Sequence, residues 1–134
     1  MKREQRREKG QSLVEVAILF PLLLLLLMGV MDLGRAYYAL VALNDAAEEG
    51  AMYASIDPGN LGEIQNRAVH ASSGLITFEA NRVNRVPSSG FAAGAPITVT
   101  VTYDLDIYTP IMQSFVDGGS LTLRGEAVNP IIAP

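Results

Sequence analysis

The sequence of 134 residues contains no cysteine and only one histidine, His70. Without cysteine the chain can form neither disulfides nor thiolate metal sites, and cysteine usage gives no information on the redox compartment. A single histidine excludes a histidine metal cluster, and no Asp-x-Asp-x-Asp-Gly calcium loop is present. We therefore predict no metal and no cofactor. The acidic residues that lie closest together in sequence are expected to be solvated surface residues: Asp45, Glu48, Glu49, Asp104, Asp106 and Asp117.

The sequence also lacks the short motifs of common catalytic sites. It has no Gly-x-Ser-x-Gly elbow for a nucleophilic serine and no Gly-x-x-x-x-Gly-Lys-Ser/Thr loop for a phosphate. A catalytic dyad built on His70 would need a partner that the sequence does not identify, so this histidine is expected to be an ordinary helix-surface residue. We predict that the chain is not an enzyme.

Positive charge is scarce beyond the first ten residues. Residues 1–10 hold five of the ten Lys and Arg residues and carry a net charge of +3, whereas the other 124 residues carry −7. A basic end before an apolar run favours a cytoplasmic N-terminus and an exported C-terminal part. Because an acidic exported part is poorly suited to bind nucleic acid, no nucleic-acid partner is expected.

The long apolar run after Gly10 is the most informative feature of the sequence. Residues 16–31 are uncharged, and counting from Gln11 gives 21 residues, or about 31 Å of helix, enough for a hydrocarbon core of about 30 Å. Only Glu15 interrupts the run. A charged side chain within a membrane costs roughly 2.5–3.5 kcal/mol on insertion scales. An acidic residue kept at that cost indicates a partner or a function.

The helical pattern continues past the predicted membrane segment. We predict one helix over 11–54, which spans the membrane over about 12–31 and is followed by the turn formers Pro58 and Gly59. A weak apolar stripe predicts a short second helix over 61–73. The first ten residues form a separate basic leader.

The second half of the sequence has the pattern of strands. Alternating apolar and polar residues predict a small antiparallel sheet of three strands whose middle strand is central and half-buried. The expected fold class is therefore α+β, with a small exported domain over 55–134. The three predicted strands are 75–83, 97–108 and 121–128.

Polar and aromatic residues mark the predicted outer boundary of the membrane. Asp32 and Arg35 have the i,i+3 spacing of a helical ion pair, which is worth about 0.2–0.5 kcal/mol. The alternative is a contact with a neighbouring subunit, and Gly34 leaves room for close helix contact. Tyr37 and Tyr38 suit the headgroup layer.

The order of features at the N-terminus resembles a type IV prepilin signal. A short basic leader ends in Gly10, and Gln11, Ser12, Leu13, Val14 and Glu15 precede the apolar run. The resemblance implies that a prepilin peptidase cleaves between Gly10 and Gln11, so that Glu15 becomes the fifth residue of the mature chain. It also implies that Glu15 pairs with the new N-terminal ammonium of a neighbouring subunit. Such pairing is physically sound because a buried carboxylate is tolerated when a cation meets it.

More specifically, residues 10–55 resemble the TadE-like family, pseudopilins of the tight-adherence (Flp) type IV pilus system. The family pattern has Val-Glu, an apolar run containing Pro, Asp-x-Gly-Arg and Glu-Gly-Ala-x-Tyr-Ala. The sequence supplies Asp32, Gly34, Arg35, Glu49, Gly50, Ala51, Tyr53 and Ala54 at those places.

The resemblance implies a pilin-like fold and a role as a pseudopilin or minor pilin in pilus assembly for surface attachment. The implied partners are other pilin or pseudopilin subunits, a prepilin peptidase, the pilus platform proteins with their ATPase, and the lipid membrane. The implied location is the cytoplasmic membrane of a bacterium or archaeon, with the N-terminus in the cytoplasm and the domain outside, or a surface pilus.

Two other readings of the N-terminal segment stay open at this stage. One is an uncleaved signal-anchored envelope protein whose small domain binds an external ligand or partner. The other is a secreted soluble domain behind an ordinary signal peptide, which is weaker because Glu15 interrupts the apolar region and no convincing A-x-A site follows it promptly. Proteolysis after Gly10 discriminates the first of these from the pilin reading.

Overall fold

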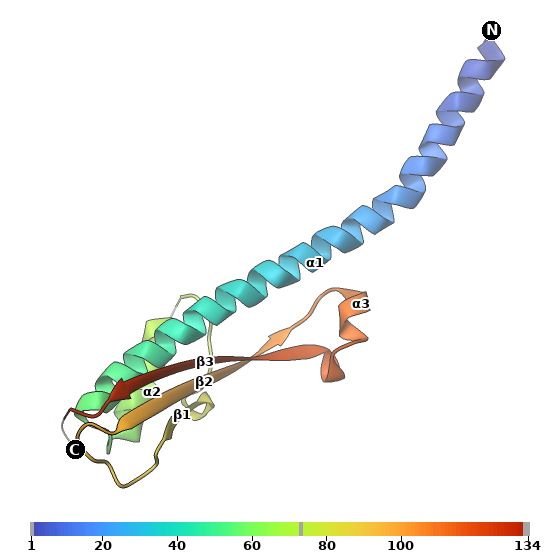
Figure 1. The fold of residues 1–134 in the computed structure, drawn as a ribbon. Coiled ribbons are helices and arrows are strands. Elements are labelled where there is room, and N and C mark those ends of the chain that lie inside the picture. The colour runs from blue at the N-terminus through green and yellow to red at the C-terminus, as the bar shows by residue number, and fades with distance from the viewer. Residues whose placement is uncertain (1, 73, 133–134) are drawn as a thin grey trace.

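A long helix and a small α+β domain make up the fold, as the sequence predicted. The computed structural model describes residues 2–72 and 74–132, and Figure 1 shows that the C-terminal half of helix α1 lies against the domain while its N-terminal half extends away from it. The elements are α1 (Lys2–Ile56), α2 (Leu61–Ser72), η1 (Ala80–Arg82), β1 (Val83–Val86), β2 (Pro96–Asp106), α3 (Pro110–Gln113), η2 (Asp117–Gly119) and β3 (Ser120–Pro130).

The N-terminal half of α1 is apolar and exposed. The helix over Gly10–Ile56 is long and apolar enough to cross a membrane, by length and composition, and its most apolar stretch is not buried in the fold. Pro21 lies inside the helix and cannot donate a backbone hydrogen bond, which favours a bend. Figure 1 shows that α1 bends along this half.

The C-terminal half of α1 contributes to the core through a face of small residues. These residues recur every three or four positions, which places them on one side of the helix. Alanine is also the best intrinsic helix former, so the same residues favour the helix and allow close packing. The buried positions of this face are Ala39, Ala42, Leu43, Ala46, Ala47, Gly50, Ala51 and Ala54.

The sheet is antiparallel with the order β1-β2-β3, so β2 is central, as predicted. One face of β2 packs onto the helices and the other faces solvent, which the strict alternation of apolar and polar residues along this strand requires. The buried residues of β2 are Ile97, Val99, Val101 and Leu105.

The first predicted strand, 75–83, is wrong. Only Val83–Val86 forms β1, and residues 75–79 follow an irregular path into the short helix η1. The backbone N–H groups of Leu75 and Ile76 donate to the carbonyl oxygen of Ser72 at the end of α2, so this segment caps a helix and does not pair in the sheet. Phe78 of this segment is buried in the core and Ile76 packs against it, whereas Leu75 is exposed.

Strand β3 crosses α1 at very short range. A methyl group at Gly125 would overlap the carbonyl oxygen of Leu43 and lie 2.8 Å from the backbone nitrogen of Asn44. Gly125 pairs with Val101 of the central strand and is buried. Only glycine allows the sheet and the helix backbone to approach this closely.

Candidate functional site

The best-defined polar cluster of the molecule surrounds Asp32, where α1 emerges from the predicted membrane span. The Asp32 side chain is only 4% exposed. Its carboxylate accepts hydrogen bonds from the backbone N–H of Thr109 at 2.8 Å and from the Thr109 hydroxyl at 2.7 Å. The backbone N–H of Tyr108 donates to both carboxylate oxygens, at 3.2 and 3.1 Å. One acidic side chain of α1 thus satisfies three donors of a loop 76–77 residues away.

Arg35 reinforces the same contact from the next turn of the helix. Its Nη1 lies 3.5 Å from Asp32 Oδ1 and donates a hydrogen bond of 3.1 Å to the backbone carbonyl of Asp106. Its guanidinium carbon lies 4.2 Å from the centre of the Tyr108 ring, which is within the range of a cation–π interaction. The predicted i,i+3 pair is therefore present; Arg35 also binds the last residue of β2, and Asp32 binds the loop that follows this strand.

Local sequence explains why the loop presents its donors to α1. Strand β2 ends at Asp106, and Pro110 occupies the first turn of α3, where its missing N–H costs nothing. Thr109 stands at the N-cap of α3, yet its side chain makes no capping hydrogen bond and its hydroxyl donates to Asp32. The N-cap residue of α3 is thus used to fasten the loop to α1.

Electrostatics favours the charged form of Asp32. The hydroxyl of Thr109, the backbone N–H groups of Thr109 and Tyr108 and the charge of Arg35 together hold the pKa of the Asp32 carboxyl below its ordinary value of 3.8. Burial acts in the opposite direction but does not overcome these donors. Asp32 is therefore a buried, charged and fully hydrogen-bonded group.

The other predicted boundary residues lie at the surface around this cluster. Tyr37 is 72% exposed and Tyr38 is 50% exposed. A methyl group at Gly34 would meet no atom within 4 Å outside its own helix, so this glycine is not required by packing within the chain. These residues are available to lipid or to another molecule.

The predicted cleavage and pairing residues lie far from Asp32. Gly10, Gln11 and Glu15 are all exposed on the free half of α1. Glu15 precedes Asp32 by 17 residues, about 25 Å along the helix. The fold of one chain therefore does not bring the two acidic residues together.

Sequence reasoning missed Tyr108 and Thr109, which complete the Asp32 cluster. They lie in a loop without a motif, and their distance from Asp32 along the chain hides the contact. Gly125 was also missed, although a glycine inside a strand pattern is a signal for close backbone approach.

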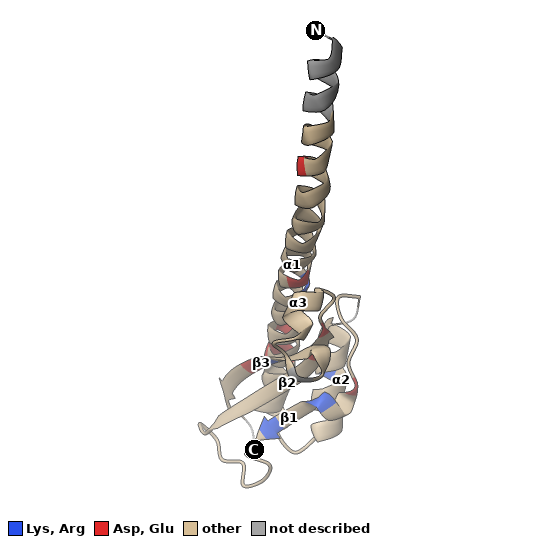
Figure 2. Ribbon diagram, turned by 90° about the vertical axis from the view of Figure 1, so that its right-hand side faces the viewer, with Lys and Arg blue, Asp and Glu red and all other residues tan. Residues whose placement is uncertain are grey.

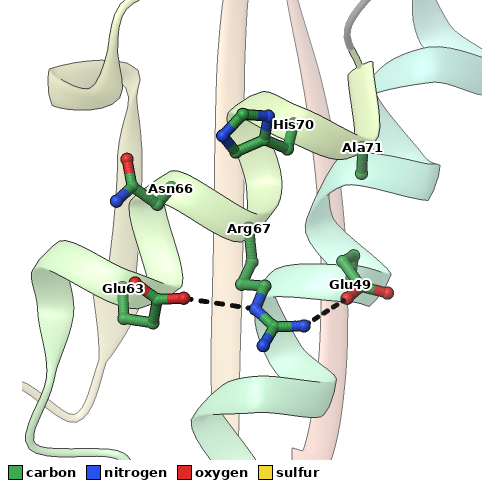
Figure 3. Close-up of a pocket in the computed structure, with 6 residues that line it drawn as sticks. All are labelled: Glu49, Glu63, Asn66, Arg67, His70 and Ala71. Carbon is green, nitrogen blue, oxygen red and sulfur yellow. Dashed lines mark hydrogen bonds and ion pairs between the residues drawn. The ribbon is translucent and has the colours of Figure 1, made fainter.

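A second polar surface lies between α1 and α2, where Arg67 forms ion pairs with two glutamates (Figure 3). It is an open hollow of about 570 Å³. Arg67 lies 3.3 Å from Glu63 and 3.5 Å from Glu49, and its guanidinium carbon lies 5.3 Å from the centre of the Tyr53 ring. His70 also lines this hollow. Within residues 2–72 and 74–132, no group of three or more His, Asp or Glu residues is placed to hold a metal ion.

We expect Asp32→Ala to release the β2–β3 loop (107–119) from α1 while the rest of the domain stays folded. The substitution leaves three donors of Tyr108 and Thr109 without their acceptor, and buried unsatisfied donors are unfavourable. Amide hydrogen exchange of the full chain in detergent should accelerate at Tyr108 and Thr109. Asp45→Ala is the matched control because Asp45 is exposed on the same helix. Unchanged exchange at both amides would show that Asp32 does not hold the loop.

The lowered pKa of Asp32 predicts a loss of stability in acid. Because the folded-state pKa lies below the unfolded value of 3.8, the contribution of this carboxylate is fully present above that value and is lost as the pH falls through the folded-state pKa. The Thr122 hydroxyl and Arg82 lower the pKa of Asp104 in the same way. Thermal unfolding at about pH 6 and about pH 3 should therefore show a smaller pH difference for Asp32→Asn than for the natural chain. An equal difference in both proteins would contradict the assignment.

Comparison with known proteins supports the predicted resemblance. A sequence model described as TadE-like protein matches residues 10–52, the segment that carries Glu15, Asp32 and Arg35, so that prediction is confirmed. The matched family is pilus-associated and structural and is not an enzyme family. The match and the long apolar helix together fit a membrane protein related to Tad pili. The chain matches none of the curated proteins and none of the solved structures with which it was compared.

Proposed function

We propose that this chain, whose residues 10–52 form a TadE-like segment, is a pseudopilin or minor pilin of a tight-adherence (Flp) type IV pilus. It is inserted as a single-pass membrane precursor with its N-terminus in the cytoplasm and its domain outside. A prepilin peptidase cleaves it between Gly10 and Gln11. The platform proteins and their ATPase then move it from the membrane into a pilus that attaches the cell to a surface.

The observation that carries this proposal is the exposed apolar half of α1. It extends beyond the domain that it belongs to, and none of its most apolar window is covered by the rest of the described chain. Such a surface needs an apolar environment, which lipid supplies for the precursor and neighbouring helices supply in a filament. Lipid tails and leucine-rich helices are similarly apolar, so the transfer from one to the other is physically feasible.

The position of Glu15 would also determine how neighbouring helices are aligned along the filament axis. Cleavage after Gly10 creates an ammonium group at Gln11, four residues before the Glu15 carboxylate. In a bundle of helices, the ammonium of one chain neutralises the Glu15 of the next, and each unpaired charge would be unfavourable in the apolar interior. This pairing favours one axial offset between neighbouring subunits.

The core face of α1 and the Asp32 cluster together give the domain a fixed position on the helix. Tyr108 and Thr109 are bound directly to α1 at the end of the span, so the domain cannot swing freely about a linker. When the pairing of Glu15 fixes the axial position of the helix, the acidic domain therefore takes a defined position on the outer surface of the filament. Tyr37 and Tyr38 are exposed at that level and are available for contact with lipid or a neighbouring subunit.

Shearing of intact cells tests this proposal against the signal-anchored alternative. A subunit of a surface pilus should appear in the sheared filament fraction of cells with an active pilus ATPase and should remain in the membrane when that ATPase is inactivated. An envelope protein that only binds an external ligand should stay in the membrane in both strains. Retention in the membrane of pilus-bearing cells would overturn the proposal.

A further inference from the structure

The β2–β3 loop (107–119) exposes an apolar surface that the core does not use. Residues 107–116 read IYTPIMQSFV and contain no charge. Phe115 is 85% exposed, Tyr108 is 63% exposed and Ile111 is 50% exposed. Large apolar side chains gathered on one exposed loop indicate an interaction surface, because a soluble surface usually avoids them.

Hydrogen bonds to α1 and within the loop hold the loop in a defined position. Asp32 binds Tyr108 and Thr109, and the Gln113 side chain donates a hydrogen bond of 2.6 Å to the carbonyl oxygen of Ile107. The Ile107 N–H donates to the carbonyl oxygen of Gly119 across the base of the loop at 3.0 Å. The apolar side chains are therefore presented in a defined position.

That position is level with the end of the predicted membrane span. Asp32 is the first residue after the span over about 12–31, and it contacts Thr109 directly. Figure 1 shows α3 at the end of the sheet nearest to the free half of α1. On α1 itself, Leu33 is 64% exposed and Tyr37 is 72% exposed at the same level. Figure 2 shows that α1 carries no Lys, Arg, Asp or Glu between the acidic residue near its top and the level of α3.

We propose that the β2–β3 loop is a second membrane contact, in which Tyr108, Ile111 and Phe115 enter the headgroup and upper acyl region of the outer leaflet beside the span. Aromatic residues favour this region, and residues 107–116 carry no charge of their own. Arg35, whose guanidinium carbon lies 4.2 Å from the centre of the Tyr108 ring, belongs to the headgroup level. Lipid is the occupant because the loop is fastened to the helix at the point where that helix leaves the bilayer. The inference rests on the membrane span of the proposed function, but not on cleavage or filament assembly.

This contact would set the orientation of the domain before assembly. A single helix leaves its tilt and rotation to its neighbours and its anchors. A second contact at the outer surface restricts both, because Asp32 couples the loop to α1. The loop must then leave the membrane when the helix is withdrawn.

Tryptophan fluorescence tests the proposal, because the natural chain contains no tryptophan. The full chain carrying Phe115→Trp is reconstituted in phosphatidylcholine vesicles with or without bromine on the upper acyl chain. We expect brominated lipid to quench most of the emission and aqueous iodide to quench little of it. Ile111→Trp should behave in the same way, which guards against disruption by one substitution.

Two matched variants define the limits of the measurement. Val86→Trp is the aqueous control, because Val86 is 66% exposed and pairs with Thr98, about 27 Å along β2 from Asp106. It should be quenched by iodide and not by brominated lipid. Leu24→Trp lies within the predicted span and should be quenched by brominated lipid.

Three outcomes would overturn the lipid contact. If Leu24→Trp is quenched by lipid and the two loop variants are quenched only by iodide, the loop proposal is wrong and the membrane span stands. If none of the three is quenched by lipid, the span and the proposed function fail as well. If protection of Phe115→Trp from iodide disappears when the protein is diluted in excess lipid, the occupant is a second copy of the chain.

Discussion

Replacing Gly125 with alanine is expected to lower the free energy of unfolding of the α+β domain by about 3 kcal/mol, the upper end of the usual range for overpacking. The added methyl group would overlap the backbone of Leu43 and Asn44, which cannot move aside as a flexible side chain does. Helix α1 and strand β3 would have to separate where they form the core. Thermal or denaturant unfolding of the full chain in detergent measures the change.

Gly50→Ala is the matched control for this prediction. A methyl group there would lie 3.1 Å from the Val99 side chain, so a side chain and not a backbone would have to shift, by a few tenths of an ångström. Replacing a helical glycine by alanine also favours the helix by up to about 1 kcal/mol, so the net change should stay below that value. If Gly125→Ala were as mild as Gly50→Ala, the close crossing of α1 and β3 would be wrong.

Glu15→Ala is expected to leave membrane insertion intact and to reduce incorporation into filaments by about a hundredfold or more. Removal of the charge makes insertion easier by roughly 2.5–3.5 kcal/mol. In the filament the same substitution leaves the N-terminal ammonium of a neighbour without its partner, and breaking a buried ion pair costs about 3–5 kcal/mol. The ratio of the chain in sheared filaments to the chain in membranes measures the effect.

Two variants separate charge from packing in that experiment. Glu15→Asp keeps the carboxylate and should retain part of the incorporation, whereas Leu24→Ala removes apolar packing from the same helix without changing a charge and measures the contribution of packing alone. Normal incorporation of Glu15→Ala would show that the charge-pairing role is wrong. Loss of the protein from the membrane would show instead that Glu15 acts in insertion.

Much of the fold was predictable because its elements have strong local patterns. Strict alternation over β2 predicted a central strand with one buried face, and the alanine-rich sequence predicted the long helix. The strand predicted over 75–83 is wrong because buried residues such as Phe78 produce an apolar pattern without strand pairing. Periodicity reports which side chains are buried, and it cannot distinguish a sheet from an irregular segment beneath a helix.

Of the residues that form the site, only those on α1 were predictable from the sequence. Asp32 and Arg35 stand out because charged residues end an apolar run, whereas Tyr108 and Thr109 belong to an ordinary loop. Their contact joins positions 76–77 residues apart, which no local pattern encodes. Glu15 is exposed on the free half of α1, and its proposed partner belongs to another molecule, so its role is a prediction from its spacing to Gly10.

The same features explain how one short chain can serve two environments. Its apolar half is suited to lipid or to a bundle of helices, and its small-residue half builds a core without disulfides. Asp32, between the two halves of α1, binds the loop nearest to the predicted span. The orientation and axial position of the helix in the membrane or filament therefore determine the position of the domain.

Intact-mass and N-terminal peptide measurement of the chain from its native envelope tests the central claim most directly. The account predicts a mature chain that begins at Gln11 and lacks the first ten residues, in cells whose prepilin peptidase is active. A population that uniformly retains Met1 in such cells would contradict it.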